Sequence, residues 1–200
     1  MVRMPDSRPY HHGDLRSTLL AGAERTLREK GAGALSLREL AREAGVSHAA
    51  PGRHFKDKQA LLNALALTGY DRLGQALESA DDPALPLEWR LTVLARAYLA
   101  FAIDNGELLE LMYARKHEPD ASEQMASAVD RTVGSLERVI ADAQERGEIV
   151  AGDPHRITLL TGATLQGIAS FAAGGMLDPR SALDGIEELV HLLLHGLRPR

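Results

Sequence analysis

The stretch of sequence best equipped to hydrogen bond to a nucleic acid is "GVSHAAPGRHF", residues 45 to 55. It combines a hydroxyl, two imidazoles and a guanidinium group with two small alanines, and it looks like the reading end of a small DNA-binding helix. Groups of these kinds bind phosphate oxygens and the edges of bases. Such a helix must nevertheless accommodate Pro51 and Gly52, which stand side by side in its middle.

Proline and glycine near the start of a helix weaken it without excluding it. If Ser47 caps the helix, Pro51 is its fourth residue, and the missing N–H removes only the first intrahelical bond, to the Ser47 carbonyl. Proline also disfavours helical angles at Ala50, which would delay the start by two or three residues. Gly52 costs roughly 1 kcal/mol relative to alanine inside a helix. We therefore expect a short, less rigid helix here.

A helix-turn-helix layout surrounds this stretch. Apolar residues at helical spacing predict a first helix over about residues 14 to 30. Ser36 can cap a second helix, with Glu39 reaching back to complete a capping box. Gly45 suits the left-handed residue that ends this helix, and Ser47 can cap the next one. Two helices joined by so short a turn are the pattern of a helix-turn-helix.

Helices account for the rest of the chain as well. Asp57 can cap a long helix that runs to the break "DDPALP" at residues 81 to 86, and Asp153 and Asp178, each followed by proline, can cap the last two helices. The further helices are predicted at about residues 87 to 104, 106 to 116, 121 to 146, 155 to 173 and 180 to 197. No alternating strand pattern occurs in the sequence. The chain is therefore predicted to be all-α, with about nine helices.

Charge is distributed unevenly along the 200 residues, whose formal net charge is -5. Residues 1 to 72 hold 12 basic and 8 acidic side chains, and residues 73 to 200 hold 11 basic and 20 acidic ones. A basic head on an acidic body suits a protein that meets phosphates with one end. The absence of cysteine excludes disulfides and thiolate metal sites. Without a long apolar run or a signal peptide, we expect a cytoplasmic protein with no membrane partner.

With these elements placed, the chain resembles the tetracycline-repressor (TetR) family of bacterial transcriptional regulators. The resemblance is carried by "YHHGDLRSTLLAGAERTLREKG" and "LSLRELAREAGVSHAAPGRHFKDKQALL", and it is strong over residues 10 to 65. It implies a three-helix helix-turn-helix DNA-binding domain, residues 1 to 60, followed by a helical effector-binding and dimerisation domain, residues 61 to 200.

One branch of the family, named after a C-terminal Trp-His-Gly motif, is the most similar through "SHAAP" and "YHHGDLR". Here Gly162 and Gln166 align with the Trp and His of that motif, and only Gly167 is kept. Members of the branch commonly have proline where Pro51 stands. Gly52, however, replaces a family tyrosine that hydrogen bonds to a DNA phosphate, so one phosphate anchor is missing.

The resemblance also implies which residues of the head contact DNA. Tyr10, His11 and His12 are expected to form an arm along the backbone. The implied contacts are to bases through His48, Ala49 and Ala50, and to phosphates through Ser36, Arg38, Ser47, Arg53, His54 and Lys58.

Family members dimerise through the last two helices and bind small effectors in the second domain. Apolar stripes on these helices could close a four-helix bundle across a two-fold axis, or pack only within their own core. A dimer would place two reading helices roughly 34 Å apart on a palindromic operator in double-stranded DNA. The predicted interface residues are Ile157, Leu160, Leu165, Ile168, Leu183, Ile186, Val190, Leu193 and Leu197. The predicted effector-pocket residues, which could equally be ordinary core, are Trp89, Tyr98, Phe101, Met112, Tyr113, His117, Met125 and Gln166.

These patterns predict a homodimeric regulator, by family default a repressor, that a small molecule releases from its operator. The alternative is a helical protein-protein adaptor that has lost DNA binding, which Gly52 favours; residues 36 to 55 could also be a plain helical corner. No HExxH, Gly-x-Ser-x-Gly, Walker or dinucleotide motif indicates an enzyme or a cofactor. His191 and His195 are spaced as metal ligands can be, but no third ligand is evident near them, or near His11 and His12, and we expect no metal site.

Overall fold

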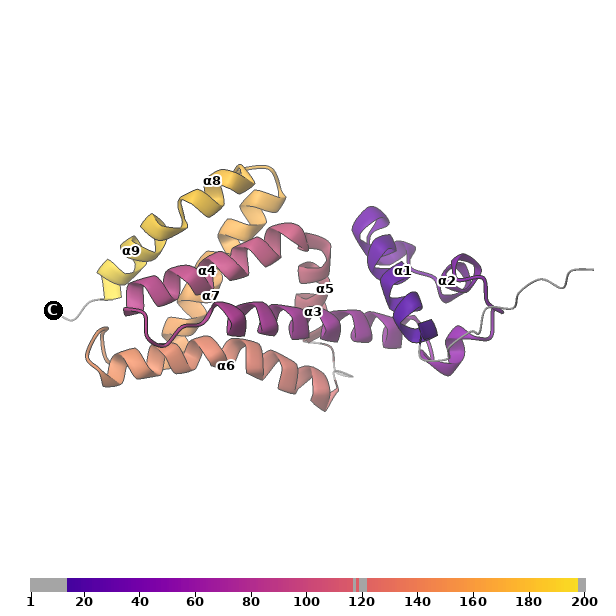
Figure 1. The fold of residues 1–200 in the computed structure, drawn as a ribbon, viewed down its shortest axis with the longest axis horizontal. Helices are drawn as coiled ribbons and strands as arrows, with labels where there is room; N and C mark the ends of the chain where they lie inside the picture. Colours follow the sequence, from indigo (N-terminus) through magenta and orange to yellow (C-terminus); the bar gives the residue numbers. More distant parts are fainter. Residues whose placement is uncertain (1–13, 117, 119–121, 198–200) are drawn as a thin grey trace, which may run out of the picture. The chain divides into compact units, whose positions relative to one another are not determined.

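The computed structural model describes residues 14–116, 118 and 122–197. Its elements (Figure 1) are α1 (Asp14–Lys30), the 3-10 helix η1 (Ala32–Ala34), α2 (Leu37–Glu43), the 3-10 helix η2 (Pro51–Arg53), α3 (Lys58–Ala80), α4 (Leu87–Asp104), α5 (Gly106–Lys116), α6 (Glu123–Glu145), α7 (Pro154–Ala173), α8 (Pro179–Asp184) and α9 (Ile186–Leu197). These described parts of the chain contain no strand, and the all-α prediction is confirmed.

The chain divides into two compact units, Met1–Leu65 and Ala66–Arg200. Helix α3 contributes residues to both units without interruption. The domain boundary expected after residue 60 therefore stays a prediction, because no break in the helix marks it.

The first unit is built around one face of α1. Leu19, Ala23 and Leu27 are almost completely buried there, and α1 packs against η1 and α2, to which Leu40 and Ala41 contribute the facing side chains. Burial of aliphatic side chains at helical spacing is the main stabilising contribution in a unit of this size.

The corner after α2 forms as predicted, but the start of α2 is not capped in the predicted way. Gly45 has a φ of 68°, and the N–H of Val46 donates to the carbonyl of Ala41 over 3.0 Å, which satisfies a carbonyl at the helix end. At the other end Ser36 is the N-cap residue, yet its side chain makes no capping bond. Glu39 instead accepts from Arg42 at 2.7 Å, so the predicted capping box is wrong.

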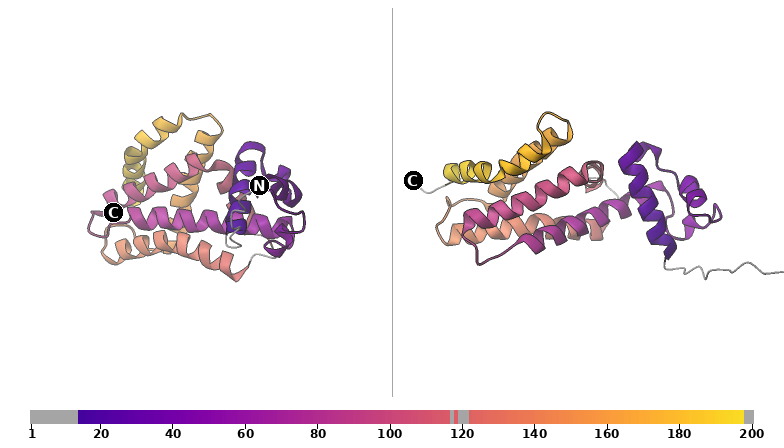
Figure 2. Two further views of the ribbon diagram at one scale, coloured as in Figure 1. Left: turned by 45° about the vertical axis from the view of Figure 1, so that its right-hand side comes forward. Right: turned by 45° about the horizontal axis from the view of Figure 1, so that its top comes forward.

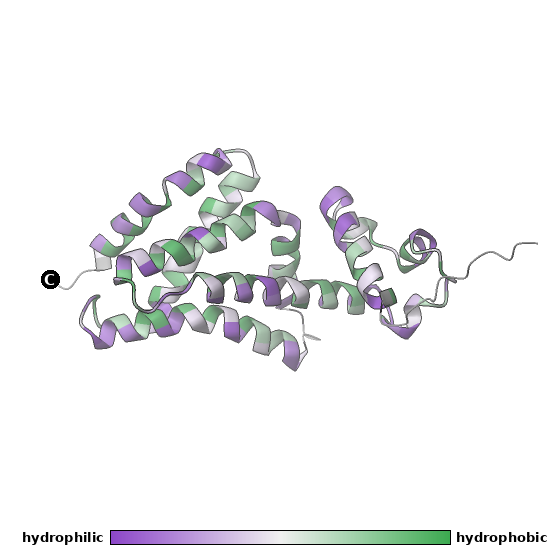
Figure 3. Cartoon of the chain, viewed as in Figure 1, coloured by the Kyte–Doolittle hydropathy of each residue, from purple (hydrophilic) through white to green (hydrophobic). Residues whose placement is uncertain are grey.

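The second unit is a bundle in which α4 packs against α7 and α9, and α6 packs against α7. Figure 3 shows hydrophobic residues along α4 and α7, where the two helices meet. Helices α3 and α6 run side by side in the views of Figures 1 and 2, and Arg131 donates to Asp71 across them at 3.1 Å. No helix within the described ranges is both long and apolar enough to cross a bilayer.

Helix starts in this chain follow the predicted acidic caps. Asp57, Asp153 and Asp178 accept backbone N–H bonds of 2.8, 3.0 and 2.9 Å at the starts of α3, α7 and α8. The helix expected over residues 180 to 197 is divided at Gly185 into α8 and α9. Both sides of this break remain connected by backbone bonds, since Gly185 donates to the Ser181 carbonyl at 3.0 Å.

Candidate functional site

The stretch expected to be a reading helix is a turn followed by the short 3-10 helix η2. The N–H of Ala50 donates to the Ser47 carbonyl, and that of Arg53 donates to the Ala50 carbonyl. Pro51 has no N–H for the Ser47 carbonyl, so α-helical pairing cannot begin there. The expectation of an α-helix after Ser47 is therefore wrong. Ala50 itself keeps helical angles, φ −62° and ψ −42°, against the predicted effect of the following proline, because its own N–H holds it in the turn.

Two buried side chains anchor this turn to the first unit. Pro51 is fully buried, and Phe55 is 2% exposed with the Arg16 guanidinium 5.5 Å from its ring centre. Between the anchors Gly52 and Arg53 face solvent. The turn is thus fixed by apolar contacts and presents its polar groups outward.

The residues predicted to contact DNA share this surface but differ in exposure. Lys58 is partly committed inside the unit, because its ammonium group donates to the Gly33 carbonyl at 2.8 Å and ties the start of α3 to η1. The exposed members are Arg38, Ser47, His48, Ala49 and Arg53, and the half-buried members are Ser36, Ala50, His54 and Lys58. Tyr10, His11 and His12 lie outside the described residues.

Acidic groups beside the turn are neutralised within the unit. Glu39 pairs with Arg42, and the hydrogen bond and positive charge of Arg42 lower the pKa of Glu39. Glu43 pairs with Arg25 at 2.9 Å. With these carboxylates paired, the cationic side chain of Arg53 faces solvent without an acidic group of α2 opposing it. The surface can therefore attract an anionic partner.

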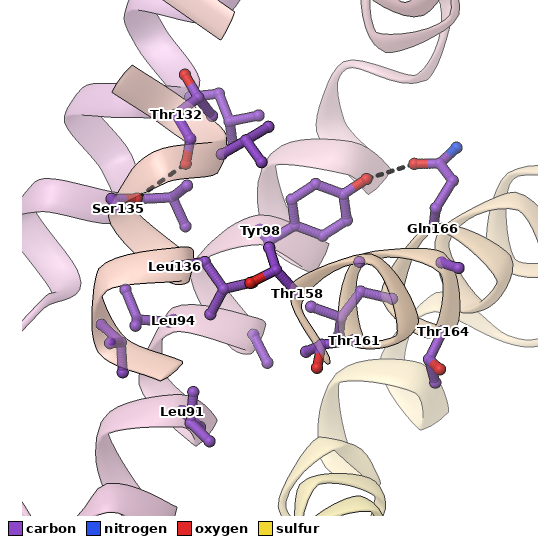
Figure 4. A pocket seen from close by; sticks show the side chains of 18 of the residues that line it. Leu91, Leu94, Tyr98, Thr132, Ser135, Leu136, Thr158, Thr161, Thr164 and Gln166 are labelled. Carbon is purple, nitrogen blue, oxygen red and sulfur yellow. Dashed lines mark hydrogen bonds between the residues drawn. The ribbon is translucent and has the colours of Figure 1, made fainter. Parts of the chain in front are cut away.

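The second unit contains a cavity of about 590 Å³, lined by residues of α3, α4, α5, α6, α7 and α9. Most of its lining is aliphatic, including Leu91, Leu94 and Leu136 (Figure 4). A mostly apolar cavity of this size with a few polar groups is typical of small-molecule sites.

A small hydrogen-bonded network crosses the cavity from α4 to α7. The Tyr98 hydroxyl donates to Oε1 of Gln166 (Figure 4) and lies 3.1 Å from the Tyr113 hydroxyl. The Gln166 amide nitrogen in turn lies 3.3 Å from the Ser170 hydroxyl. Burial, and secondarily the neighbouring Tyr113, raises the pKa of Tyr98. The Tyr98 hydroxyl is therefore neutral at physiological pH.

Half of the residues predicted for the effector pocket line the cavity: Tyr98, Met112, Tyr113 and Gln166. Trp89 is instead 51% exposed, and Phe101 and Met125 are described residues outside the lining. His117 lies outside the described residues. Gly162, aligned with the Trp of the branch motif, also borders the cavity.

Sequence reasoning missed the other hydroxyl-bearing residues of the lining, Tyr70, Thr132, Ser135, Thr158, Thr161 and Thr164. A usable signal was present, because Thr158 and Thr161 are three apart on a helix that is otherwise rich in aliphatic residues. Hydroxyls on the inner side of such a helix indicate a polar requirement inside the core.

Only part of the predicted interface stripe is exposed. Ile157, Ile186 and Val190 are largely buried by their own chain, so they have little surface left to bury against a partner, and their place in the interface stays a prediction. Leu165, Ile168, Leu183 and Leu193 are half-buried, and the side chain of Leu197 is not described. Leu160 is 51% exposed, and sequence reasoning missed its exposed neighbours, of which Leu159 and Leu192 are 64% and 59% exposed.

The histidine pair of α9 is engaged with a carboxylate. His191 Nδ1 lies 2.7 Å from Glu88 Oε1 on α4, and the His191 and His195 rings stack at 6.5 Å between centres. No cluster of three metal-ligating side chains occurs among the described residues.

Comparison with known proteins matches both units. Residues 19–65 match the model for bacterial regulatory proteins of the tetR family, and residues 91–197 match the tetracyclin repressor-like C-terminal domain. The chain is 46% identical to a protein of unknown function from Rhodococcus sp. RHA1, with a TM-score of 0.87 over 96% of this chain and 100% of that one.

Two further relatives are more distant. A bacterial regulatory protein in the tetR family from Rhodococcus RHA1 shares the fold, with 23% identity and a TM-score of 0.75 over 93% of this chain and 98% of that one. An HTH-type transcriptional regulator from Mycobacterium bovis is 29% identical over 131 residues, which are 62% of this chain and 55% of that protein. The chain thus spans about half the length of this curated relative.

Fold, helical corner and matched domains define a helix-turn-helix DNA-binding protein of the non-enzymatic, regulatory kind. The chain belongs to the TetR family of transcriptional regulators.

Proposed function

We propose that this regulator is a homodimeric repressor that binds a palindromic operator and is released from it by a small molecule. The observation that carries the proposal is the cavity of about 590 Å³ in a chain that also presents an exposed helix-turn corner. A mostly apolar cavity of this size supports a small-molecule site, because protein interiors otherwise pack densely.

The proposed DNA surface is the turn from Ser47 to Phe55 with the start of α2. His48 and Ala49 are exposed and read bases, while Arg38 and Arg53 bind phosphates. The paired carboxylates of Glu39 and Glu43 support this assignment, since unpaired acidic groups would repel the backbone.

The proposed dimer forms through the exposed apolar face of α7 and α9, represented by Leu160 and Leu192. Both helices pack against α4, and exposed apolar residues on such helices are a usual sign of an interface. Helix α3 carries Lys58 of the first unit and also Tyr70 and Leu73 of the cavity lining. A ligand that shifts α3 changes the placement of the DNA-binding units of the dimer. Release requires that the ligand bind the DNA-free form more tightly than the DNA-bound form.

The test is fluorescence anisotropy with duplex pools enriched by repeated selection, scanned over salt concentration. One palindrome should be preferred over scrambled duplex, with log affinity falling linearly with log salt. Binding of no duplex at low salt would contradict the proposal.

The second candidate is a protein-protein adaptor without DNA binding. It is favoured by η2, because three residues of 3-10 helix replace the expected reading helix. Its prediction is the absence of salt-dependent duplex binding, so the same experiment separates the two.

A further inference from the structure

The hydroxyls that line the cavity have already used their hydrogens. Thr132, Thr158 and Thr161 are each more than nine-tenths buried and donate to the carbonyl four residues earlier in their own helices, over 2.9 Å. Ser135 donates to the Thr132 carbonyl at 2.8 Å (Figure 4). Each hydroxyl oxygen keeps its lone pairs but has no second hydrogen to offer. These positions can accept a hydrogen bond from a ligand, but they cannot donate one.

Among the members of the Tyr98 network that line the cavity, counting hydrogens leaves one donor. Tyr98 has a single hydroxyl hydrogen and gives it to Gln166, so the bond between the two tyrosines is donated by Tyr113. The Gln166 amide has two hydrogens, of which one is directed to Ser170. The second amide hydrogen has no partner among the described residues and remains for a ligand.

The lining also includes five acidic or basic side chains, and none of them is fully buried: Glu78, Asp81, Lys116, Arg138 and His155. Asp81 is held by Arg90 through bonds of 2.6 and 2.9 Å, and the ammonium of Lys116 lies 5.0 Å from the centre of the Tyr113 ring. Glu78 and Arg138 are exposed. An ionised ligand group buried among the aliphatic residues would lose its hydration without a matching charge, which is costly.

We propose that the cavity selects an uncharged, predominantly apolar molecule that places one carbonyl or hydroxyl oxygen against the second amide hydrogen of Gln166. This inference deepens the proposed function, because it assumes that the effector binds in this cavity. A ligand hydroxyl or primary amide can also donate to the Tyr113 or threonine oxygens. Ligands with one of these two groups therefore make the most hydrogen bonds in the cavity. A carboxylate needs several donors and an ammonium needs a negative charge, whereas the groups that are hydrogen bonded to Gln166, the Tyr98 and Ser170 hydroxyls, carry no charge.

The experiment measures displacement of the neutral fluorophore N-phenyl-1-naphthylamine from the full-length protein. Four competitors contain the same number of carbon atoms in one unbranched chain: decan-1-ol, decanamide, decanoate and decylammonium, with decane as the compound without a polar group. We expect the alcohol and the amide to compete at concentrations about tenfold lower than either ion, which corresponds to about 1.4 kcal/mol.

The substitution Gln166→Leu removes the remaining donor, and Gln124→Leu on the exposed side of α6 is its matched control. Gln166→Leu should weaken the alcohol and the amide about threefold to tenfold while leaving decane unchanged, since a neutral hydrogen bond contributes about 1 kcal/mol. Gln124→Leu should change none of these values. Unchanged binding of decane shows that the variant has kept its cavity.

The inference is overturned if decanoate or decylammonium competes as well as the alcohol, if Gln166→Leu preserves the ranking, or if nothing displaces the fluorophore. Operator release is measured separately by anisotropy. If the alcohol binds with the expected preference but leaves DNA binding unchanged, the effector role fails while the ligand class stands.

Discussion

The backbone of Gly69 in α3 lies directly against the side chain of Met112 in α5. A methyl group at Gly69 would stand 2.5 Å from the Met112 Sδ and 2.9 Å from its Cγ. The next residue, Tyr70, donates from its hydroxyl to the Met112 carbonyl at 3.2 Å. Because Met112 and Tyr70 both line the cavity, this crossing joins α3 and α5 at the cavity wall.

Gly69→Ala should destabilise the protein even though alanine favours helices. The propensity gain of about 1 kcal/mol is outweighed by overpacking, which typically costs about 1–3 kcal/mol. In urea unfolding we expect a net loss of about 1 kcal/mol. Movement of the Met112 side chain also reduces the volume of the cavity, so the affinity for the neutral fluorophore should fall.

Gly134→Ala is the matched control, because nothing lies within 4 Å of a methyl group there. It should stabilise α6 by about 1 kcal/mol. In a Met112→Ala background Gly69→Ala should lose its cost, giving a non-additive cycle. Additive effects would show that the two residues do not interact as described.

Gly52→Tyr should tighten operator binding. Gly52 is exposed, no atom lies within 4 Å of the position that a Cβ would take there, and its φ is not positive, so tyrosine fits without strain. A hydroxyl bonded to a phosphate contributes about 1.5–3 kcal/mol, or about tenfold or more in affinity. Gly52→Phe, which lacks the hydroxyl, should produce much less of this gain. Equal effects of the two variants would exclude the phosphate contact.

Arg53→Ala and His48→Ala should weaken DNA binding in different ways. Loss of a phosphate contact at Arg53 should lower the affinity for selected and scrambled duplexes alike. It should also reduce the slope of log affinity against log salt concentration by about 1. Loss of a base contact at His48 should cost about 1–3 kcal/mol on the selected sequence only. The exposed Arg180→Ala serves as control. An unchanged salt slope for Arg53→Ala would remove this residue from the interface.

Leu192→Glu should convert the proposed dimer to monomer. The side chain is 59% exposed in the single chain, so the change costs little within a protomer but places a charge in the apolar interface. Sedimentation velocity should show the lower mass, with helicity unchanged. Ala126→Glu, on the exposed side of α6, should leave the mass unaltered. If the Leu192→Glu variant is still a dimer, the interface does not include Leu192.

Asp81→Asn should remove stability in a pH-dependent way. The hydrogen bond from Arg90 lowers the pKa of Asp81 in the folded state, so the pair stabilises the protein above the unfolded pKa of about 3.9. The loss should be about 2 kcal/mol at neutral pH and should disappear as the pH falls through the folded pKa of Asp81. Urea unfolding at several pH values measures it, with the exposed Asp130→Asn as control. A difference independent of pH would mean that the charge of Asp81 is not involved.

Local chemistry accounts for what could be predicted. The start of α3 follows from Asp57 and the end of α2 from Gly45, because a cap needs only residues a few positions apart. Even so, local rules failed at residues 47 to 55, where both a short and a delayed helix were compatible with Pro51. Burial of Pro51 and Phe55 against the first unit selected the turn and η2.

By itself, the sequence determined the all-α fold, most helix bounds and the family, since these depend on periodicity, caps and motif spacing. Tertiary structure alone decided which side chains meet. Tyr98 and Gln166 are 68 positions apart, and no local pattern joins them. Ile186 and Leu192 share one amphipathic helix, yet the first is fully buried and the second exposed, because only the packing of α9 on α4 determines which side of the helix is covered.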